Sequence, residues 1–314
     1  MVTRNQWGAL VLVMNLAACG GGGGEGGGAA SSVAGSRSSS SSAVSSAGAS
    51  SSASSSAGAA SSSAASSAAA SASVSSSSAS SSSALNAAWP PGQNFDLSHW
   101  KLQLPDADTT EIPASTLSAG YTSQYFYTDT DGAMTFWAPT TGATTQNSHY
   151  PRSELREMLD PSSSKVNWGW QGTHIMKLTG KVVKLPSTGK VIVAQIHAIE
   201  EDGTNAPPLV KIVFNTNQLD GQVKSDSSGS GSDVHNYFTN IAVGDRYDVE
   251  IRVTNGVAFI TVNGDTRSVD FVSMDAGWKN LKYYFKAGNY VQDNSADGGS
   301  ATTKLYSLSV SHSN

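Results

Sequence analysis

Residues 247–262 read YDVEIRVTNGVAFITV, and this stretch decides the fold class. Apolar and polar side chains alternate on both sides of Asn255-Gly256. A period of two residues is typical of a β-strand with one buried face, because successive side chains of a strand point to opposite faces. Asn-Gly between two such runs is a strong signal for a two-residue hairpin turn. The stretch therefore predicts an antiparallel β-hairpin.

Short runs of the same kind recur along the chain, whereas helical periodicity is scarce. They lie at residues 100–104, 181–185, 191–197, 210–214 and 305–310. Turn signals such as Ser187-Thr188-Gly189 and Asn263-Gly264-Asp265 separate them. Many short strands at this spacing predict an all-β fold of the sandwich or jelly-roll type. No internal repeat is visible, which argues against a propeller or a solenoid.

The composition divides the chain into three segments. Residues 19–86 are almost entirely Ser, Ala and Gly, and such a segment buries too little apolar surface to offset its ordering entropy. We therefore expect a disordered linker at 19–86 and one domain at 87–314, which is long enough for a sizeable core. Residues 1–18 contain a positive charge at Arg4, followed by a short apolar run, as in an export signal.

The apolar run ends at Leu16-Ala17-Ala18-Cys19, which resembles the lipobox of bacterial lipoproteins. That resemblance implies cleavage before Cys19, lipidation of its thiol, and a domain tethered to the outer membrane of a bacterium. The alternative is an ordinary signal peptide with an incidental cysteine, which would give a secreted protein. Cys19 is the single cysteine of the chain, so no intramolecular disulfide is possible.

Three polar segments interrupt the apolar pattern, and the first is residues 151–157, PRSELRE. In a strand, Arg152, Glu154 and Arg156 would share one face, with Ser153 and Leu155 on the other. Two guanidinium groups with a carboxylate between them make a rigid surface that suits a carboxylated ligand. The same pattern also fits a solvated ladder of charges, so this segment alone does not decide between the two.

The second segment is Gln195-Ile196-His197, at the end of a strongly apolar run that suggests a central strand. Gln195 and His197 would share a face, and polar groups on such a strand need partners or a wet cleft. Histidine is suited to proton transfer near neutral pH. A lone histidine at this position is more often structural.

The third segment is residues 283–292, YYFKAGNYVQ. In a strand, Tyr284, Lys286, Tyr290 and Gln292 would share a face, and Gly288 would leave a gap there that a ligand could approach. An exposed strand with cross-strand aromatic pairs is the alternative interpretation.

Together, RSELR at 152–156, QIH at 195–197 and YFKAGNYVQ at 284–292 resemble, in order and separation, the three signature motifs of the family 7 alginate lyases. The resemblance spans nearly all of residues 95–314. It implies a concanavalin-like β-jelly roll with a concave substrate groove, no metal, no other cofactor and a monomer. It also implies cleavage of alginate, a chain of 4-linked uronic acids, by β-elimination, leaving an unsaturated uronate at the new non-reducing end.

The resemblance also assigns roles to residues of the three segments. Arg152, Gln195 and His197 would surround the substrate carboxyl group, and Tyr290 would protonate the leaving oxygen. The base would be His197 or Tyr290, depending on which face of the sugar carries the proton. Within that family, Ile in the middle of the Gln-x-His motif goes with activity on guluronate-containing chains and Val with polymannuronate, so the resemblance implies guluronate-containing blocks for Ile196. The expected substrate-binding residues along the groove are Glu154, Arg156, Lys286, Tyr284 and Gln292.

The charge balance gives a condition that the structure can test. The chain carries a formal net charge of -5, although its expected substrate is a polyanion. We therefore expect a basic groove on an acidic body, because local charges in a cleft outweigh the net charge. No basic stripe or nucleic-acid-binding motif is present, so we do not expect nucleic acid to bind.

Two other classes of function remain open from the residues alone. A glycoside hydrolase normally needs two suitably spaced carboxylates, but Glu154 and Glu157 would point to opposite faces of a strand. A carbohydrate-binding module needs no Gln, His, Tyr and Arg cluster arranged for proton transfer. The remaining histidines show no spacing typical of a metal site. His149 is expected in a surface loop, with a position at the edge of the groove as the alternative. These histidines are His99, His149, His174, His235 and His312.

Overall fold

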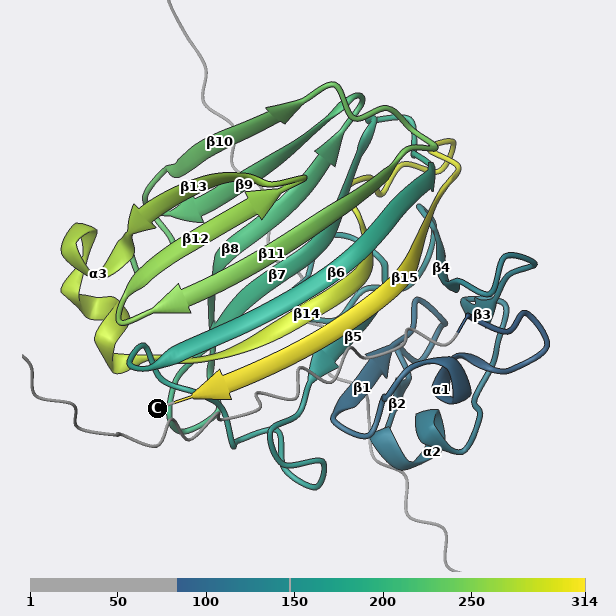
Figure 1. Cartoon of the computed structure of the whole chain (residues 1–314), viewed down its shortest axis with the longest axis horizontal. Coiled ribbons are helices and arrows are strands. Elements are labelled where there is room, and N and C mark those ends of the chain that lie inside the picture. Colours follow the sequence, from purple (N-terminus) through teal and green to yellow (C-terminus); the bar gives the residue numbers. More distant parts are fainter. Residues whose placement is uncertain (1–83, 147, 314) are drawn as a thin grey trace, which may run out of the picture. The chain divides into compact units, whose positions relative to one another are not determined.

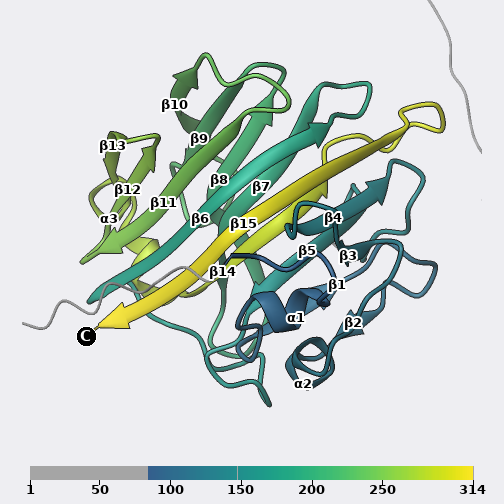
Figure 2. The ribbon, with the colours of Figure 1, turned by 45° about the vertical axis from the view of Figure 1, so that its right-hand side comes forward.

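Two antiparallel β-sheets pack face to face in the computed structural model, which describes residues 84–146 and 148–313 (Figures 1 and 2). The all-β jelly-roll prediction is confirmed. The predicted signal segment, the lipidation site at Cys19 and the linker up to residue 83 lie outside the described residues. Among the helices within those residues, none combines the length and the apolar character that crossing a membrane requires.

The first sheet has eight strands in the order β10-β9-β8-β7-β14-β5-β1-β2. Strand β14 comes late in the chain but lies between β7 and β5, at the centre of this sheet (Figure 1). The bounds are β1 Trp100–Gln103, β2 Glu111–Ile112, β5 Arg152–Glu157, β7 Lys190–Ile199, β8 Asn205–Asn215, β9 Gln218–Lys224, β10 Asp233–Thr239 and β14 Lys282–Val291.

The second sheet has seven strands in the order β13-β12-β11-β6-β15-β4-β3. Short helices lie at its margins and in the N-terminal part of the domain (Figure 1). The strands are β3 Phe126–Thr128, β4 Met134–Pro139, β6 Thr173–Lys184, β11 Arg246–Thr254, β12 Val257–Val262, β13 Asp265–Asp270 and β15 Ser300–Ser313; the helices are α1 Pro91–Asn94, α2 Ala114–Ser118, α3 Phe271–Met274 and the 3₁₀ helix η1 Ala276–Asn280.

The predicted hairpin is the β11–β12 pair. Thr254 lies opposite Val257, so the turn consists of Asn255 and Gly256 alone. Both residues have positive φ angles, 48° and 86°, as a two-residue turn of this kind requires. The pairing of β11 with β12 therefore agrees with the hairpin that the alternating pattern predicts.

The core lies between the sheets and is built from alternate residues of the strands. On β7, Ala194, Ile196 and Ala198 are buried, and on β14, Phe285 and Ala287 have no exposed surface. The polar neighbours of these residues therefore point away from the second sheet. This alternation makes the outer face of the eight-stranded sheet polar, and the candidate site lies on that face.

Candidate active site

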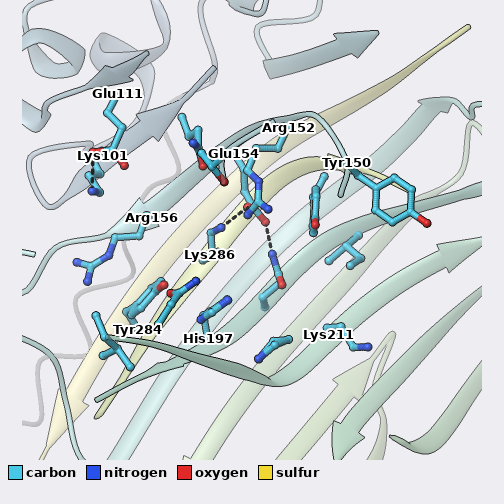
Figure 3. Close-up of a pocket in the computed structure, with 18 of the residues that line it drawn as sticks. Lys101, Glu111, Tyr150, Arg152, Glu154, Arg156, His197, Lys211, Tyr284 and Lys286 are labelled. Carbon is cyan, nitrogen blue, oxygen red and sulfur yellow. Dashed lines mark hydrogen bonds and ion pairs between the residues drawn. The ribbon is translucent and has the colours of Figure 1, made fainter. Parts of the chain in front are cut away.

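The three polar segments are brought together on three adjacent strands, β5, β14 and β7. The registers place Lys286 beside Arg156 on one side and beside Gln195 on the other, and Tyr284 beside His197. These strands form the floor of a groove of about 510 Å³ (Figure 3). All nine predicted site residues of the domain line it: Arg152, Glu154, Arg156, Gln195, His197, Tyr284, Lys286, Tyr290 and Gln292.

Glu154 is the centre of the polar network on the groove floor, and none of its surface is exposed. Its Oε2 atom lies 2.5 Å from Lys286 Nζ and 3.2 Å from the Arg152 guanidinium. Its Oε1 atom accepts a hydrogen bond from Gln195 Nε2 at 2.5 Å. Burial alone would raise the pKa of the carboxyl, but Lys286 and Arg152 hold it below its usual value. Glu154 thus remains ionised and fixes two cations and an amide in place.

Lys286 is almost fully buried beside this carboxylate. Burial is the main reason that its pKa falls to about 8, and the positive charge of Arg152 lowers it further, against the opposing effect of Glu154. Two cations share one carboxylate here, so the floor keeps an excess of positive charge.

His197 lies on β7 at the edge of this network and stacks on the Tyr284 ring, with centroids 5.4 Å apart. Its Nδ1 atom is 2.9 Å from the backbone oxygen of Ala198. A carbonyl can only accept, so Nδ1 carries the proton and Nε2 has a free lone pair. Burial lowers the pKa of His197 to about 3, and Lys286 adds to this. The imidazole is therefore neutral near pH 7, with Nε2 unprotonated.

Tyr290 lies at the other end of the same floor. The Arg152 guanidinium lies over its ring, 3.8 Å from the centroid. Ser148 Oγ is 3.1 Å from the Tyr290 hydroxyl, 2.7 Å from Arg152 Nη2 and 3.0 Å from the Tyr150 backbone oxygen. Ser148 can give its own proton to Tyr150 and then accepts from both other groups. This serine therefore holds the Tyr290 hydroxyl and the Arg152 guanidinium together.

Arg156 has a different role from the one that the strand pattern suggests. Its guanidinium donates to the backbone oxygens of Glu157 and Ser164 and to the side chain of Asn167. It also lies 4.1 Å from the centroid of the Tyr284 ring. Most of its donors are thus used within the protein. Arg156 lines the groove, but it mainly ties loop 160–167 to the floor and supports Tyr284, whose pKa burial raises to about 12.

One expectation about the groove needs correction. A Cβ atom at Gly288 would lie 2.8 Å from the Ser153 backbone oxygen and 3.0 Å from Glu154 Cα, so this glycine allows β5 and β14 to approach closely and does not open space for a ligand. His149 lies in an exposed loop segment, as expected, and also lines the groove. The segment before β5 folds over the groove wall, and no sequence pattern marks that path.

Comparison with known proteins decides the family. A family model described as alginate lyase matches residues 95–312. The chain belongs to this alginate lyase family. It is 78% identical to the family 7 alginate lyase A1-II', solved in complex with a substrate (GGMG); that match covers 72% of this chain and 98% of the other, with a TM-score of 0.72.

More distant members of the alginate lyase family agree with this assignment. An alginate lyase structure from Pseudomonas aeruginosa is 31% identical, covers 69% of this chain and 100% of its own, and has a TM-score of 0.62. An alginate lyase of Klebsiella pneumoniae is 35% identical over 147 residues, which are 36% of this chain and 47% of the relative. The chain thus spans about half the length of that curated relative.

The groove of this family member is basic, as the charge balance predicted. Its lining includes five cationic side chains and two carboxylates: Lys101, Arg152, Arg156, Lys211 and Lys286, with Glu111 and Glu154. The body remains acidic, with a formal net charge of -5 for the chain. Within residues 84–146 and 148–313, no group of three or more His, Cys, Asp or Glu side chains is arranged to hold a metal ion.

Sequence patterns missed several residues of this site. Ser148, which bonds Arg152 and Tyr290, and Tyr150, which lines the groove, lie in the irregular segment before β5, where no periodicity assigns a face. Lys211 lies on β8 and reaches the groove because it pairs in register with Gln195. Its alternation with Val210 and Ile212 was visible in the sequence, but the neighbour that brings it to the site was not.

Proposed function

We propose that this member of the alginate lyase family cleaves alginate by β-elimination and leaves an unsaturated uronate at the new non-reducing end. The proposal includes a preference for guluronate-containing blocks. The observation that carries it is the neutral His197, with a free Nε2, beside a floor on which Arg152 and Lys286 are held by a single buried carboxylate.

This arrangement suits removal of a proton next to a carboxylate. The C5 proton of a uronate is poorly acidic while the neighbouring carboxylate keeps its charge, so a site must neutralise that group and stabilise the enolate-like charge. The Arg152 guanidinium supplies positive charge and paired donors. The Gln195 amide has one hydrogen bonded to Glu154 and a second one free to donate.

The elimination then needs a base and an acid. The base takes the C5 proton, the C5–H electrons form the C4–C5 double bond, and the C4–O4 bond breaks. Tyr290 gives its hydroxyl proton to the departing O4, and Ser148 keeps that hydroxyl directed. His197 is the base where the C5 proton faces it. Tyr290 serves as the base for the uronate with the opposite C5 configuration.

The groove also weighs against a hydrolase. A glycosidase needs a protonated carboxylic acid near the scissile bond. Glu154 is kept ionised by its cationic neighbours, and Glu111 forms an ion pair with Lys101 at 2.8 Å. Neither carboxylate of the groove lining is arranged as a general acid.

The preference for guluronate-containing blocks rests on Ile196 within the QIH segment. It is supported by the A1-II' relatives, which were solved with a substrate (GGMG) and a product (GGG). Comparison of initial rates on guluronate-rich and mannuronate-rich alginate tests it, and equal rates would contradict it.

The full chain with Tyr290→Phe tests the mechanism. We expect the unchanged protein to release products that absorb ultraviolet light from alginate, and the variant to lose turnover by at least about 100-fold, within the range typical of general acid catalysis. Alginate binding should persist in the variant, because its ring still packs against Arg152.

Tyr306→Phe is the matched control, because Tyr306 lies on β15 in the other sheet and donates its hydroxyl to Asp131. It should leave turnover unchanged. Unchanged turnover in Tyr290→Phe would remove the role given to that phenol. New reducing ends without ultraviolet absorbance would show a hydrolase instead.

A further inference from the structure

A single row of polar side chains crosses the eight-stranded sheet, from its short strands to its far edge. Each member lies opposite the next in the strand registers. The row consists of Lys101, Arg156, Lys286, Gln195, Lys211, Gln222 and His235. The groove described above covers the first five positions, and the last two, on β9 and β10, continue the same line.

The far end of the row has an aromatic pair. On β10, Val234 and Phe238 pack against the core, so His235 and Tyr237 point to the outer face. Their rings stack, with centroids 5.6 Å apart and an interplanar angle of 11°. Tyr237 is 52% exposed, which is unusual for a large aromatic side chain on a regular strand.

A buried carboxylate fixes this pair. Asp220 on β9 is only 5% exposed, and its Oδ2 atom lies 2.7 Å from His235 Nδ1 and 2.8 Å from Gln222 Nε2. Asp220 therefore orients the imidazole and the amide, as Glu154 does for the groups of the central floor. A pre-oriented pair loses little side-chain entropy when a ligand binds.

The charges near the pair are already balanced. Lys211 and Lys224 both form ion pairs with Asp233, each at 2.8 Å, and Asp220 supplies a second carboxylate, so two cations are matched by two carboxylates. This end of the sheet therefore differs from the central floor, which has more cations than carboxylates. An aromatic face with balanced charges suits the apolar C–H face of a pyranose better than its carboxylate.

The distances along the sheet match the geometry of a sugar chain. Adjacent strands lie about 4.8 Å apart, so β10 is about 10 Å beyond Lys211 on β8. The strand spacing is close to the length of one pyranose in an extended 4-linked chain. A chain lying along the row would therefore place about two further sugars between Lys211 and the edge of the sheet.

We infer that Tyr237, His235 and Gln222 form a distal platform that binds sugars of a polymeric uronate chain beyond the central groove. The inference rests on the proposed function, because it gives a binding site to the sugars of the same substrate that lie outside the central groove. It predicts that the enzyme prefers long chains to short oligosaccharides, and that part of this preference comes from β10.

The test compares polymeric alginate with an alginate trisaccharide in the full chain carrying Tyr237→Ala. Loss of one stacking contact should raise the KM for the polymer about 3- to 10-fold, since such contacts contribute about 0.5–1.5 kcal/mol. The kcat and the kcat/KM for the trisaccharide should stay the same. Tyr237→Trp should restore the polymer KM, because an aromatic face returns.

Trp89→Ala is the matched control, because Trp89 is 48% exposed and does not line the groove. It should change neither the KM for the polymer nor the kcat/KM for the trisaccharide. An unchanged polymer KM in Tyr237→Ala, or an equal loss on both substrates, would overturn the platform.

Binding separates this inference from the proposed function. Calorimetric titration with polymeric alginate in a Tyr290→Phe background should show weaker binding when Tyr237→Ala is added. If the unchanged chain does not cleave alginate, the proposed function fails, and this titration still decides the platform: weaker binding supports it, and equal binding overturns it.

Discussion

Glu154 and Glu157 lie three residues apart on β5, and both carboxylates are buried, yet their surroundings differ completely. Glu154 faces the groove and is held by Lys286, Arg152 and the Gln195 amide. Glu157 points to the other face, as the odd spacing on a strand requires. The difference shows how one strand can build a site on one side and stabilise the core on the other.

Glu157 is held by groups that have no part in the groove. Its Oε2 atom accepts from Trp168 Nε1 at 3.1 Å and from the Phe285 backbone N–H at 2.9 Å. Its Oε1 atom lies 2.7 Å from His312 Nε2. These partners come from the 160–170 segment, from β14 and from the last strand, so Glu157 joins three separate parts of the chain.

The contact with His312 continues into a second histidine. His312 Nδ1 is 2.9 Å from His174 Nδ1, and His174 Nε2 is 2.7 Å from the Gln171 backbone oxygen. The carbonyl only accepts, so His174 carries its proton on Nε2 and accepts at Nδ1. His312 therefore donates from Nδ1, and one further proton is shared between His312 and Glu157. Burial lowers the pKa of His174, which keeps that ring neutral.

Glu154→Gln should give the largest effect on activity. The change leaves Lys286 and Arg152 without their shared carboxylate, and we expect kcat/KM to fall about 100-fold. The free energy of unfolding should fall by less than in Glu157→Gln, because Lys286 can release its proton when the carboxylate is removed. Steady-state kinetics and thermal unfolding of the same preparation measure both. A large loss of Tm with normal kcat/KM would contradict the distinction between the two carboxylates.

Glu157→Gln should lower stability and leave activity unchanged. The amide has only one acceptor oxygen, so it cannot accept from Trp168, the Phe285 N–H and His312 together, and the free energy of unfolding should fall by about 1–3 kcal/mol. The kcat of the folded protein should not change. Glu111→Gln is the control, since that side chain is 53% exposed and should leave stability nearly unchanged. Denaturant unfolding decides, and a fall in kcat without a change in stability would place Glu157 in the site.

The titration of Lys286, the partner of Glu154, should have a smaller effect on activity than the loss of Glu154. Its charge is lost as the pH rises through about 8, so the KM for alginate should rise several-fold between pH 7 and pH 9. The same titration has the opposite effect on stability, which increases as the pH rises. Between pH 8 and 10.5 the unfolded chain holds this proton and the folded chain does not, so this group makes folding more favourable as the pH rises.

Lys286→Arg separates this effect from other titrations, because an arginine stays charged throughout this range. The rise in KM should then disappear. If KM rises equally in both proteins, another group is responsible.

Local periodicity predicted much of the fold and of the site. The two-residue period assigned Arg152 and Glu154 to one face and Leu155 to the other, because that period is a property of the strand itself. Apolar runs correctly marked β7 as a central strand. Which strands lie together depends on pairing over long distances, and the position of β14 between β5 and β7 is not encoded in any local pattern.

The remaining features depend on irregular backbone or on distant contacts. Ser148 acts from a segment without periodicity. His174 and His312 are 138 residues apart and meet only because β6 and β15 pair. The sequence also could not show that the donors of Arg156 are used within the protein, because its partners lie in a loop.

The central position of β14 also has a consequence for the order of synthesis. Until residue 291 has been made, β5 and β7 each lack the neighbour that lies between them in the finished sheet. A nascent or truncated chain that ends before β14 therefore exposes two unpaired strand edges at once, and such edges promote association with other chains. It also lacks Tyr290 and Lys286, to which the proposed mechanism gives roles, so we expect a fragment of this kind to be inactive and prone to aggregation. Under the proposed mechanism, catalytic activity thus reports that β14 has entered the centre of the sheet.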